Sequence, residues 1–169
     1  GLSSWAEVWD DCYKAAAEAG LDRAYIYDSK GHYTTESMSY LVRNVRDLIG
    51  SRPQIAVHCH NDFGLATANS LEGIKAGAEV CDVLVNAIGH KGGNTSFEQI
   101  VLALEVLYNV KTNINIEKIF ELCKLVETLY RIRLPQNYPH VGDFAYTHSG
   151  SHTKPIMNGA WFTFENIKA

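Results

Sequence analysis

The chain has 169 residues, of which 46% are hydrophobic and 20% are charged, a composition that indicates one folded globular domain and excludes wholesale disorder. Its formal net charge is -4 and it contains no run of Lys or Arg, so a basic surface for nucleic acid is excluded as well. No apolar segment is long enough to cross a bilayer and no signal pattern opens the sequence, so we expect no membrane contact.

The four cysteines indicate the cellular compartment. Cys12, Cys59, Cys81 and Cys123 lie far apart and form no C-x-x-C pair. This spacing favours reduced, mostly buried thiols in a cytoplasmic protein over a disulfide framework or a zinc knuckle. The first residue is Gly1 and not Met, which suggests a processed polypeptide or a part of a longer one.

Apolar strands alternate with amphipathic helices through most of the chain. We expect a first helix that the capping box Ser4-Trp5-Ala6-Glu7 opens and Gly20 ends, followed by three strand–helix units. The expected strands are residues 24–27, 55–60 and 80–88, and the helices that follow them are residues 35–49, 64–76 and 97–107. Such alternation predicts an α/β fold with a parallel sheet. Three units can build a doubly wound sheet, but a closed eight-stranded barrel needs roughly 250 residues.

The pattern changes near the end of the chain. A further helix is expected at residues 116–130, and Pro135 and Pro139 end the regular pattern. The apolar residues expected on the inward face of this helix are Ile116, Ile119, Phe120, Cys123, Val126 and Leu129. We therefore expect residues 1–134 to form the α/β part, and residues 135–169 to begin with a linker and to lie outside it. The tail is rich in aromatic residues without a clear period, which predicts that it docks on another surface, such as a second subunit.

One stretch, His58-Cys59-His60-Asn61-Asp62, runs from the end of the second expected strand into a polar turn. Residues i and i+2 of a strand point to the same face, so His58 and His60 share a face while Cys59 points away. Neutral imidazole is the commonest protein ligand for a divalent metal, so two neighbouring imidazoles are candidates to share one cation. The alternative is a pair of ordinary surface histidines at a strand end.

The run from Val57 to Ser70, together with the Gly-Asn-Thr segment between Gly89 and Glu98, resembles the DRE-TIM metallolyase superfamily, which is also called HMGL-like. Within this superfamily the chain is most similar to 2-isopropylmalate synthase and homocitrate synthase. The resemblance implies a partial TIM barrel, made of the C-terminal βα units, followed by a helix and a small irregular subdomain. It also implies a metal-dependent condensation of acetyl-CoA with a 2-oxo acid, which gives an alkylmalate- or homocitrate-type product and free CoA.

The same resemblance implies a metal site and a substrate site. His58 and His60 match two metal-binding histidines, and Asn94 matches an asparagine at or beside the metal. The implied cofactor is a divalent ion, Zn, Mg or Mn. Asp28 and Ser29 match a pair whose hydroxyl helps to hold the carboxylate of the 2-oxo acid.

Further substrate contacts are expected from the glycine-rich loop, in particular from Gly92, Gly93 and Thr95. A loop with few side chains would let a thioester or its phosphates approach backbone N–H groups. His152 matches a catalytic histidine that the subdomain contributes to the adjacent subunit, so we expect an oligomer. Structural alternatives remain for several of these residues, as turn caps (Asp28, Asn94), a loop hydroxyl (Ser29) or an exposed tail residue (His152).

The chain also departs from the family pattern. The family's aspartate ligand, its neighbouring arginine and its catalytic glutamate have no counterpart here, and His90-Lys91 stand where the family often has Glu-Arg. We therefore expect activity only with the missing N-terminal half of the barrel, supplied by the same longer chain or by a separate subunit. The alternatives are a carbon–carbon lyase or aldolase of the same superfamily, a non-catalytic half-barrel partner subunit, and a free-standing flavodoxin-like binding domain.

Overall fold

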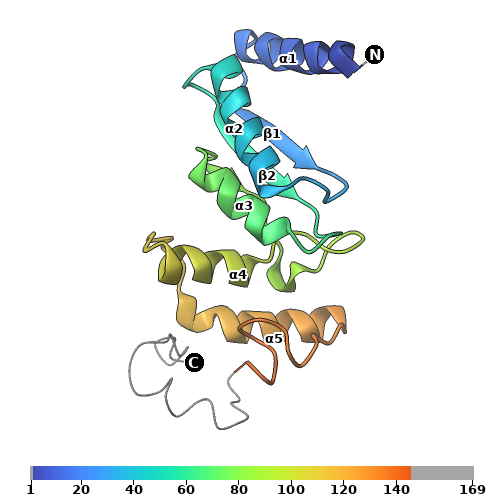
Figure 1. The fold of residues 1–169 in the computed structure, drawn as a ribbon. Helices are drawn as coiled ribbons and strands as arrows, with labels where there is room; N and C mark the ends of the chain where they lie inside the picture. The colour runs from blue at the N-terminus through green and yellow to red at the C-terminus, as the bar shows by residue number, and fades with distance from the viewer. Residues whose placement is uncertain (1, 146–169) are drawn as a thin grey trace, which may run out of the picture. The chain divides into compact units, whose positions relative to one another are not determined.

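A computed structural model of the chain describes the backbone of residues 2–145 and the side chains of residues 7–145 (Figure 1). Contacts within the chain define two compact units, the first ending at Ser96 and the second beginning at Phe97. None of the helices in this described part is long and apolar enough to span a membrane.

The first unit is built on a parallel sheet in the order β1-β2-β3. The strands are β1 (Arg23–Asp28), β2 (Gln54–Cys59) and the short β3 (Val80–Cys81). Tyr27 is paired with His58 in the register of β1 and β2, and Val57 is paired with Cys81 in that of β2 and β3. The predicted α/β class with a parallel sheet is therefore confirmed.

Three helices accompany these strands: α1 (Leu2–Glu18), α2 (Thr35–Ile49) and α3 (Ala66–Lys75). The Thr34 hydroxyl begins α2 by accepting a hydrogen bond from the Ser37 N–H, which satisfies one of the free amides of the first turn. The bounds of α2 agree with those expected from the sequence. Helix α1 begins two residues before Ser4, so the predicted capping box lies inside the helix and does not start it.

One face of the sheet carries the core. Ile26, Val57, Met38 and Val42 are almost fully buried, and a Cβ on Gly73 of α3 would lie 3.0 Å from a Val57 methyl carbon. Helices α2 and α3 therefore pack on this face, where each large buried aliphatic side chain stabilises the fold by about 1.5–3 kcal/mol. Strand residues alternate between faces, so Tyr27, which is 54% exposed, lies on the opposite face of β1.

The third expected strand is much shorter than the apolar run suggested. Only Val80–Cys81 pairs with β2, and the chain then turns through the 3-10 helix η1 (Val85–Ala87). Asn86 and Ala87 have φ values of 60° and 52°, which an extended strand cannot contain. The prediction of a strand through residue 88 was wrong, because apolar content does not distinguish a strand from a buried turn.

The second unit contains α4 (Phe97–Leu102), the π-helix η2 (Ala103–Leu107), the 3-10 helix η3 (Ile116–Lys118) and α5 (Ile119–Tyr130). Ile119 and Cys123 of α5 are buried, as predicted. Phe120 and Leu129 are 38% and 68% exposed, so their predicted inward orientation was wrong. At about 100° per residue these two side chains flank the buried stripe of α5 and do not lie on it.

Candidate active site

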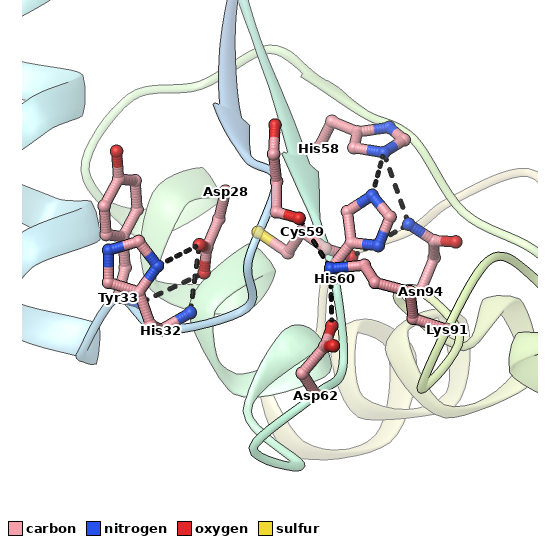
Figure 2. A network of polar contacts seen from close by, with 10 residues as sticks. Asp28, His32, Tyr33, His58, Cys59, His60, Asp62, Lys91 and Asn94 are labelled. Atoms are coloured by element: carbon pink, nitrogen blue, oxygen red, sulfur yellow. Dashed lines mark hydrogen bonds and ion pairs between the residues drawn. The ribbon is translucent and has the colours of Figure 1, made fainter.

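The carboxyl ends of the three strands lie at one edge of the sheet, because parallel strands all end on the same side. Beyond this edge β2 continues into His60, and the loop after η1 returns to meet it. His60 forms an isolated bridge with Asn94, and the Asn61 N–H donates to the Gly93 carbonyl at 2.9 Å. Long-range backbone pairing therefore brings the Gly-Asn segment to the His58–His60 pair (Figure 2).

The two histidines lie side by side, as strand alternation predicted. Nε2 of His58 is 3.4 Å from Nε2 of His60, and the ring centroids are 5.2 Å apart. Two nitrogens that share a tetrahedral zinc, each about 2.0–2.1 Å from it, would be separated by about 3.3–3.4 Å. The observed separation therefore fits a shared divalent ion.

Asn94 lies beside the histidine pair, with its amide nitrogen turned towards His58. Nδ2 of Asn94 donates towards Nε2 of His58 at 3.2 Å and to the Cys59 carbonyl at 3.3 Å. A cation would bind the amide oxygen, so Asn94 would have to turn its side chain to become a ligand. Within residues 7–145, no group of three His, Cys, Asp or Glu side chains is arranged to hold a metal. The histidine pair thus offers a partial coordination shell.

Asp82 is a further member of the site, and it lies outside the motifs that predicted the other members. Its Oδ2 lies 3.2 Å from Nδ1 of His58, whereas the other ring nitrogen, Nε2, faces His60. No local signal in the sequence indicates it, because its approach to His58 depends on the parallel register of β2 and β3, in which Val57 is paired with Cys81. In such a ladder the next residues, His58 and Asp82, are also neighbours.

Lys91 supplies a positive charge beside the histidines. Its Nζ lies 3.2 Å from Oδ2 of Asp62 and donates to the Ser29 carbonyl at 2.7 Å (Figure 2). Burial lowers the pKa of His60, the Lys91 ammonium and the His58 ring lower it further, and Asp62 opposes them. Neutral imidazole is the form that binds a metal, so this environment favours the form of His60 that can act as a ligand.

Asp28 occupies a different place from the histidine pair (Figure 2). Its carboxylate is fully buried and accepts hydrogen bonds from the backbone N–H groups of His32 and Tyr33, at 3.0 and 3.1 Å. It therefore caps the turn after β1. Ser29 is exposed and joins the site through its carbonyl, which accepts from Lys91.

Thr95 lies inside the fold. Its side chain is fully buried, and its hydroxyl is 2.6 Å from the Ser70 hydroxyl and 3.3 Å from the Ala66 carbonyl. Both hydrogen bonds hold the loop to α3, so the structure gives this hydroxyl structural partners.

The glycines of the loop allow close backbone approach. Gly93 has φ +88°, and a Cβ on it would overlap with the Ala87 carbonyl oxygen. Its N–H already donates to the His90 carbonyl at 3.1 Å, so it is not available to a substrate in this conformation. A Cβ on Gly92 would lie 3.0 Å from the Asn61 carbonyl oxygen. His152, the predicted catalytic histidine, lies outside the described residues.

A parallel sheet of βα units with polar residues gathered at the carboxyl ends of its strands is the arrangement of (β/α)-barrel enzymes. The chain belongs to the HMGL-like family, whose sequence pattern matches residues 4–126. Homocitrate synthase AksA of Methanocaldococcus jannaschii is 40% identical over 146 residues, which cover 86% of this chain and 36% of that protein. The 2-isopropylmalate synthase of the same organism is 39% identical, over 93% of this chain and 30% of that protein.

The structural comparison agrees with the sequence comparison. The HMG-CoA lyase of Bacillus subtilis superposes with a TM-score of 0.59 at 28% identity, over 72% of this chain and 42% of that one. The chain thus spans about a third of the length of the curated relatives named above and less than half of this solved structure. The expectation of a partial TIM barrel is confirmed.

Proposed function

We propose that this chain supplies the metal-binding part of an enzyme that condenses acetyl-CoA with a 2-oxo acid and water, forming an alkylmalate- or homocitrate-type product and free CoA. The observation that carries the proposal is the 3.4 Å separation of the His58 and His60 Nε2 atoms at the carboxyl end of β2. Membership of the HMGL-like family and 39–40% identity to two condensing synthases support the reaction type.

The residues present divide the work between holding a cation and shaping its surroundings. His58 and His60 would hold a divalent ion through Nε2, and Asn94 would add its amide oxygen after turning. When bound, such an ion polarises the carbonyl of the 2-oxo acid and binds its carboxylate. Lys91, whose ammonium group pairs with Asp62, would help to keep His60 in the neutral form that binds the ion.

The remaining machinery is proposed to come from outside residues 7–145. Two histidines and an asparagine leave a divalent ion short of ligands, and the residue that removes a proton from the acetyl methyl group is still required. Within the described part of the chain the sheet also ends at β1 and β3, and these two parallel edges call for further strands. We propose that the N-terminal half of the barrel supplies these strands, the missing acidic ligand and the base.

The test is an assay of the assembly that completes the barrel. Acetyl-CoA is offered with a panel of 2-oxo acids of different chain length, and release of the CoA thiol is followed in the presence of Zn, Mg or Mn. Loss of Lewis-acid stabilisation of about 3 kcal/mol corresponds to about 100-fold in rate, so His58→Ala and His60→Ala should each lower turnover by at least that factor. His32→Ala, which removes an exposed loop histidine, is the matched control and should retain turnover.

Three outcomes separate the alternatives. Metal-dependent CoA release that requires both histidines supports the condensation. Cleavage of a 3-hydroxyacyl-CoA without condensation would assign the chain to a carbon–carbon lyase instead. Activity of the assembly that survives both histidine substitutions would show that this chain is a non-catalytic partner.

A further inference from the structure

We propose that Asp82 is a positioning residue, which holds the His58 ring in the tautomer whose Nε2 lone pair faces the metal position. The proposal rests on the proposed function, because it concerns a ligand of the metal in that function. Neither the family resemblance nor the spacing of the motif assigns a role to this residue.

The fold places Asp82 beside His58 through backbone pairing. Val57 and Cys81 are partners in the parallel register of β2 and β3, and the Asp82 N–H donates to the Val57 carbonyl at 3.0 Å. Asp82 therefore follows directly after β3, and its backbone is hydrogen-bonded to β2, the strand that carries His58. This backbone hydrogen bond fixes the position from which the carboxylate extends.

The hydrogen bonds around the ring select one tautomer. A carboxylate can only accept, so Nδ1 of His58, 3.2 Å from Asp82 Oδ2, must carry the proton. In the neutral ring Nε2 is then an acceptor, in agreement with the Asn94 Nδ2 donor 3.2 Å away. Two independent contacts therefore indicate the same tautomer. It directs the Nε2 lone pair towards the space shared with His60.

The same geometry excludes Asp82 as a ligand of that ion. Nδ1 and Nε2 point away from one another across the imidazole ring, so a group bonded to Nδ1 cannot reach an ion bound at Nε2. The ring of Tyr27, with its centroid 5.2 Å away, packs against His58 from the neighbouring strand. A carboxylate on the far nitrogen of a metal-binding histidine is the arrangement that orients such ligands and raises their basicity.

His60 has no comparable support. Its Nδ1 is buried without a hydrogen-bond partner among the described residues. The pair is therefore unequal: Asp82 orients His58 before metal arrives, whereas His60 is held mainly by its backbone bridge to Asn94. This inequality predicts that removal of one carboxylate disturbs one specific ring.

The experiment uses the full assembly with Asp82→Asn, Asp82→Glu and the matched control Glu79→Gln. Glu79 precedes β3, whereas Asp82 follows it, and the Glu79 carboxylate accepts hydrogen bonds from Arg46 and the Ile55 N–H. The control therefore also removes one negative charge, but at the end of β3 that is away from the site. An amide at position 82 can donate to Nδ1, which favours the opposite tautomer. The affinity for Co²⁺ alone, measured by its visible absorption, should fall about 10- to 100-fold in Asp82→Asn. It should recover in Asp82→Glu and stay unchanged in Glu79→Gln.

A second readout needs neither metal nor activity. NMR of the imidazole nitrogens in the metal-free protein should show the proton of His58 on Nδ1 in the wild type and on Nε2 in Asp82→Asn. Unchanged Co²⁺ affinity in Asp82→Asn, or an unchanged tautomer, would overturn the proposal. Failure of the wild-type protein to bind Co²⁺ would overturn the proposed function instead, and the NMR comparison would still decide whether Asp82 sets the tautomer.

Discussion

Lys91 and Asp62 form an ion pair, Nζ to Oδ2 at 3.2 Å, that joins the loop after η1 to the turn after β2. The same ammonium group donates to the Ser29 carbonyl in the turn after β1. The Lys91 side chain therefore connects its own loop to the turns that follow β1 and β2. The Lys91 backbone is in the left-handed region, with φ 58°.

Replacement of Lys91 by Met should loosen these segments without unfolding the sheet. Hydrogen exchange of residues 29–32 and 61–65 should become faster, because the turns lose their common contact while the strand hydrogen bonds remain. Lys75→Met removes a similar exposed pair with Glu72 on α3 and should leave these segments unchanged. Equal protection of both turns in Lys91→Met would contradict this role.

Gly89→Ala should displace Asn94. A Cβ at position 89 would overlap with Oδ1 of Asn94 and lie 2.7 Å from a methyl carbon of Leu84. Overpacking of this kind costs about 1–3 kcal/mol of unfolding free energy, which chemical denaturation would measure. Addition of Asn94→Ala removes one of the two clashes and should restore part of the loss. If the double variant loses as much unfolding free energy as the two single variants together, or more, the proposed clash is wrong.

Thr95→Val separates a structural role from a substrate-binding one. The change leaves the buried Ser70 hydroxyl without its partner at 2.6 Å, which should lower the unfolding free energy by about 1–3 kcal/mol. The apparent affinity for substrates should stay within the error of the wild type, since the hydroxyl is enclosed. A higher KM with unchanged stability would return Thr95 to the substrate site.

The cysteines should differ sharply in alkylation. Burial raises the pKa of Cys59 and Cys123 to about 12, and that of Cys81 to about 11, so few of these thiols are ionised at about pH 8. Cys12 is exposed on α1. Timed treatment with iodoacetamide and mass spectrometry of the peptides should show Cys12 modified first. Modification of Cys59 at the same rate would show that β2 opens more readily than its burial implies.

His140 should make the second unit less stable in acid. Burial lowers the pKa of His140 below its ordinary 6.5, and the nearby Glu98 opposes this shift. The unfolded chain therefore binds the proton more readily than the folded one. The contribution of neutral His140 to the unfolding free energy is complete above about pH 6.5, the pKa in the unfolded chain. This contribution is lost as the pH falls through the lower pKa that His140 has in the folded protein. The drop in unfolding temperature between about pH 8 and about pH 5 should be smaller in His140→Gln than in the wild type. An equal drop in both proteins would show that His140 does not cause the loss of stability in acid.

Several features of the fold followed from local patterns. The bounds of α2 and the existence of β1 and β2 could be predicted, because apolar periodicity and caps depend on residues a few positions apart. The truncation of β3 could not be predicted. Asn86 and Ala87 adopt positive φ although no glycine is present to indicate a turn.

For the site, the sequence by itself determined that His58 and His60 share a face, because the two-residue period of a strand is a property of the local backbone. Only the tertiary structure decided which groups meet them. Strand register put Asp82 on the far nitrogen of His58, and a long-range bridge brought Asn94 to the near one. These neighbours are separated from His58 by 24 and 36 positions, and their approach depends on hydrogen bonds between strands and loops, which no local period encodes.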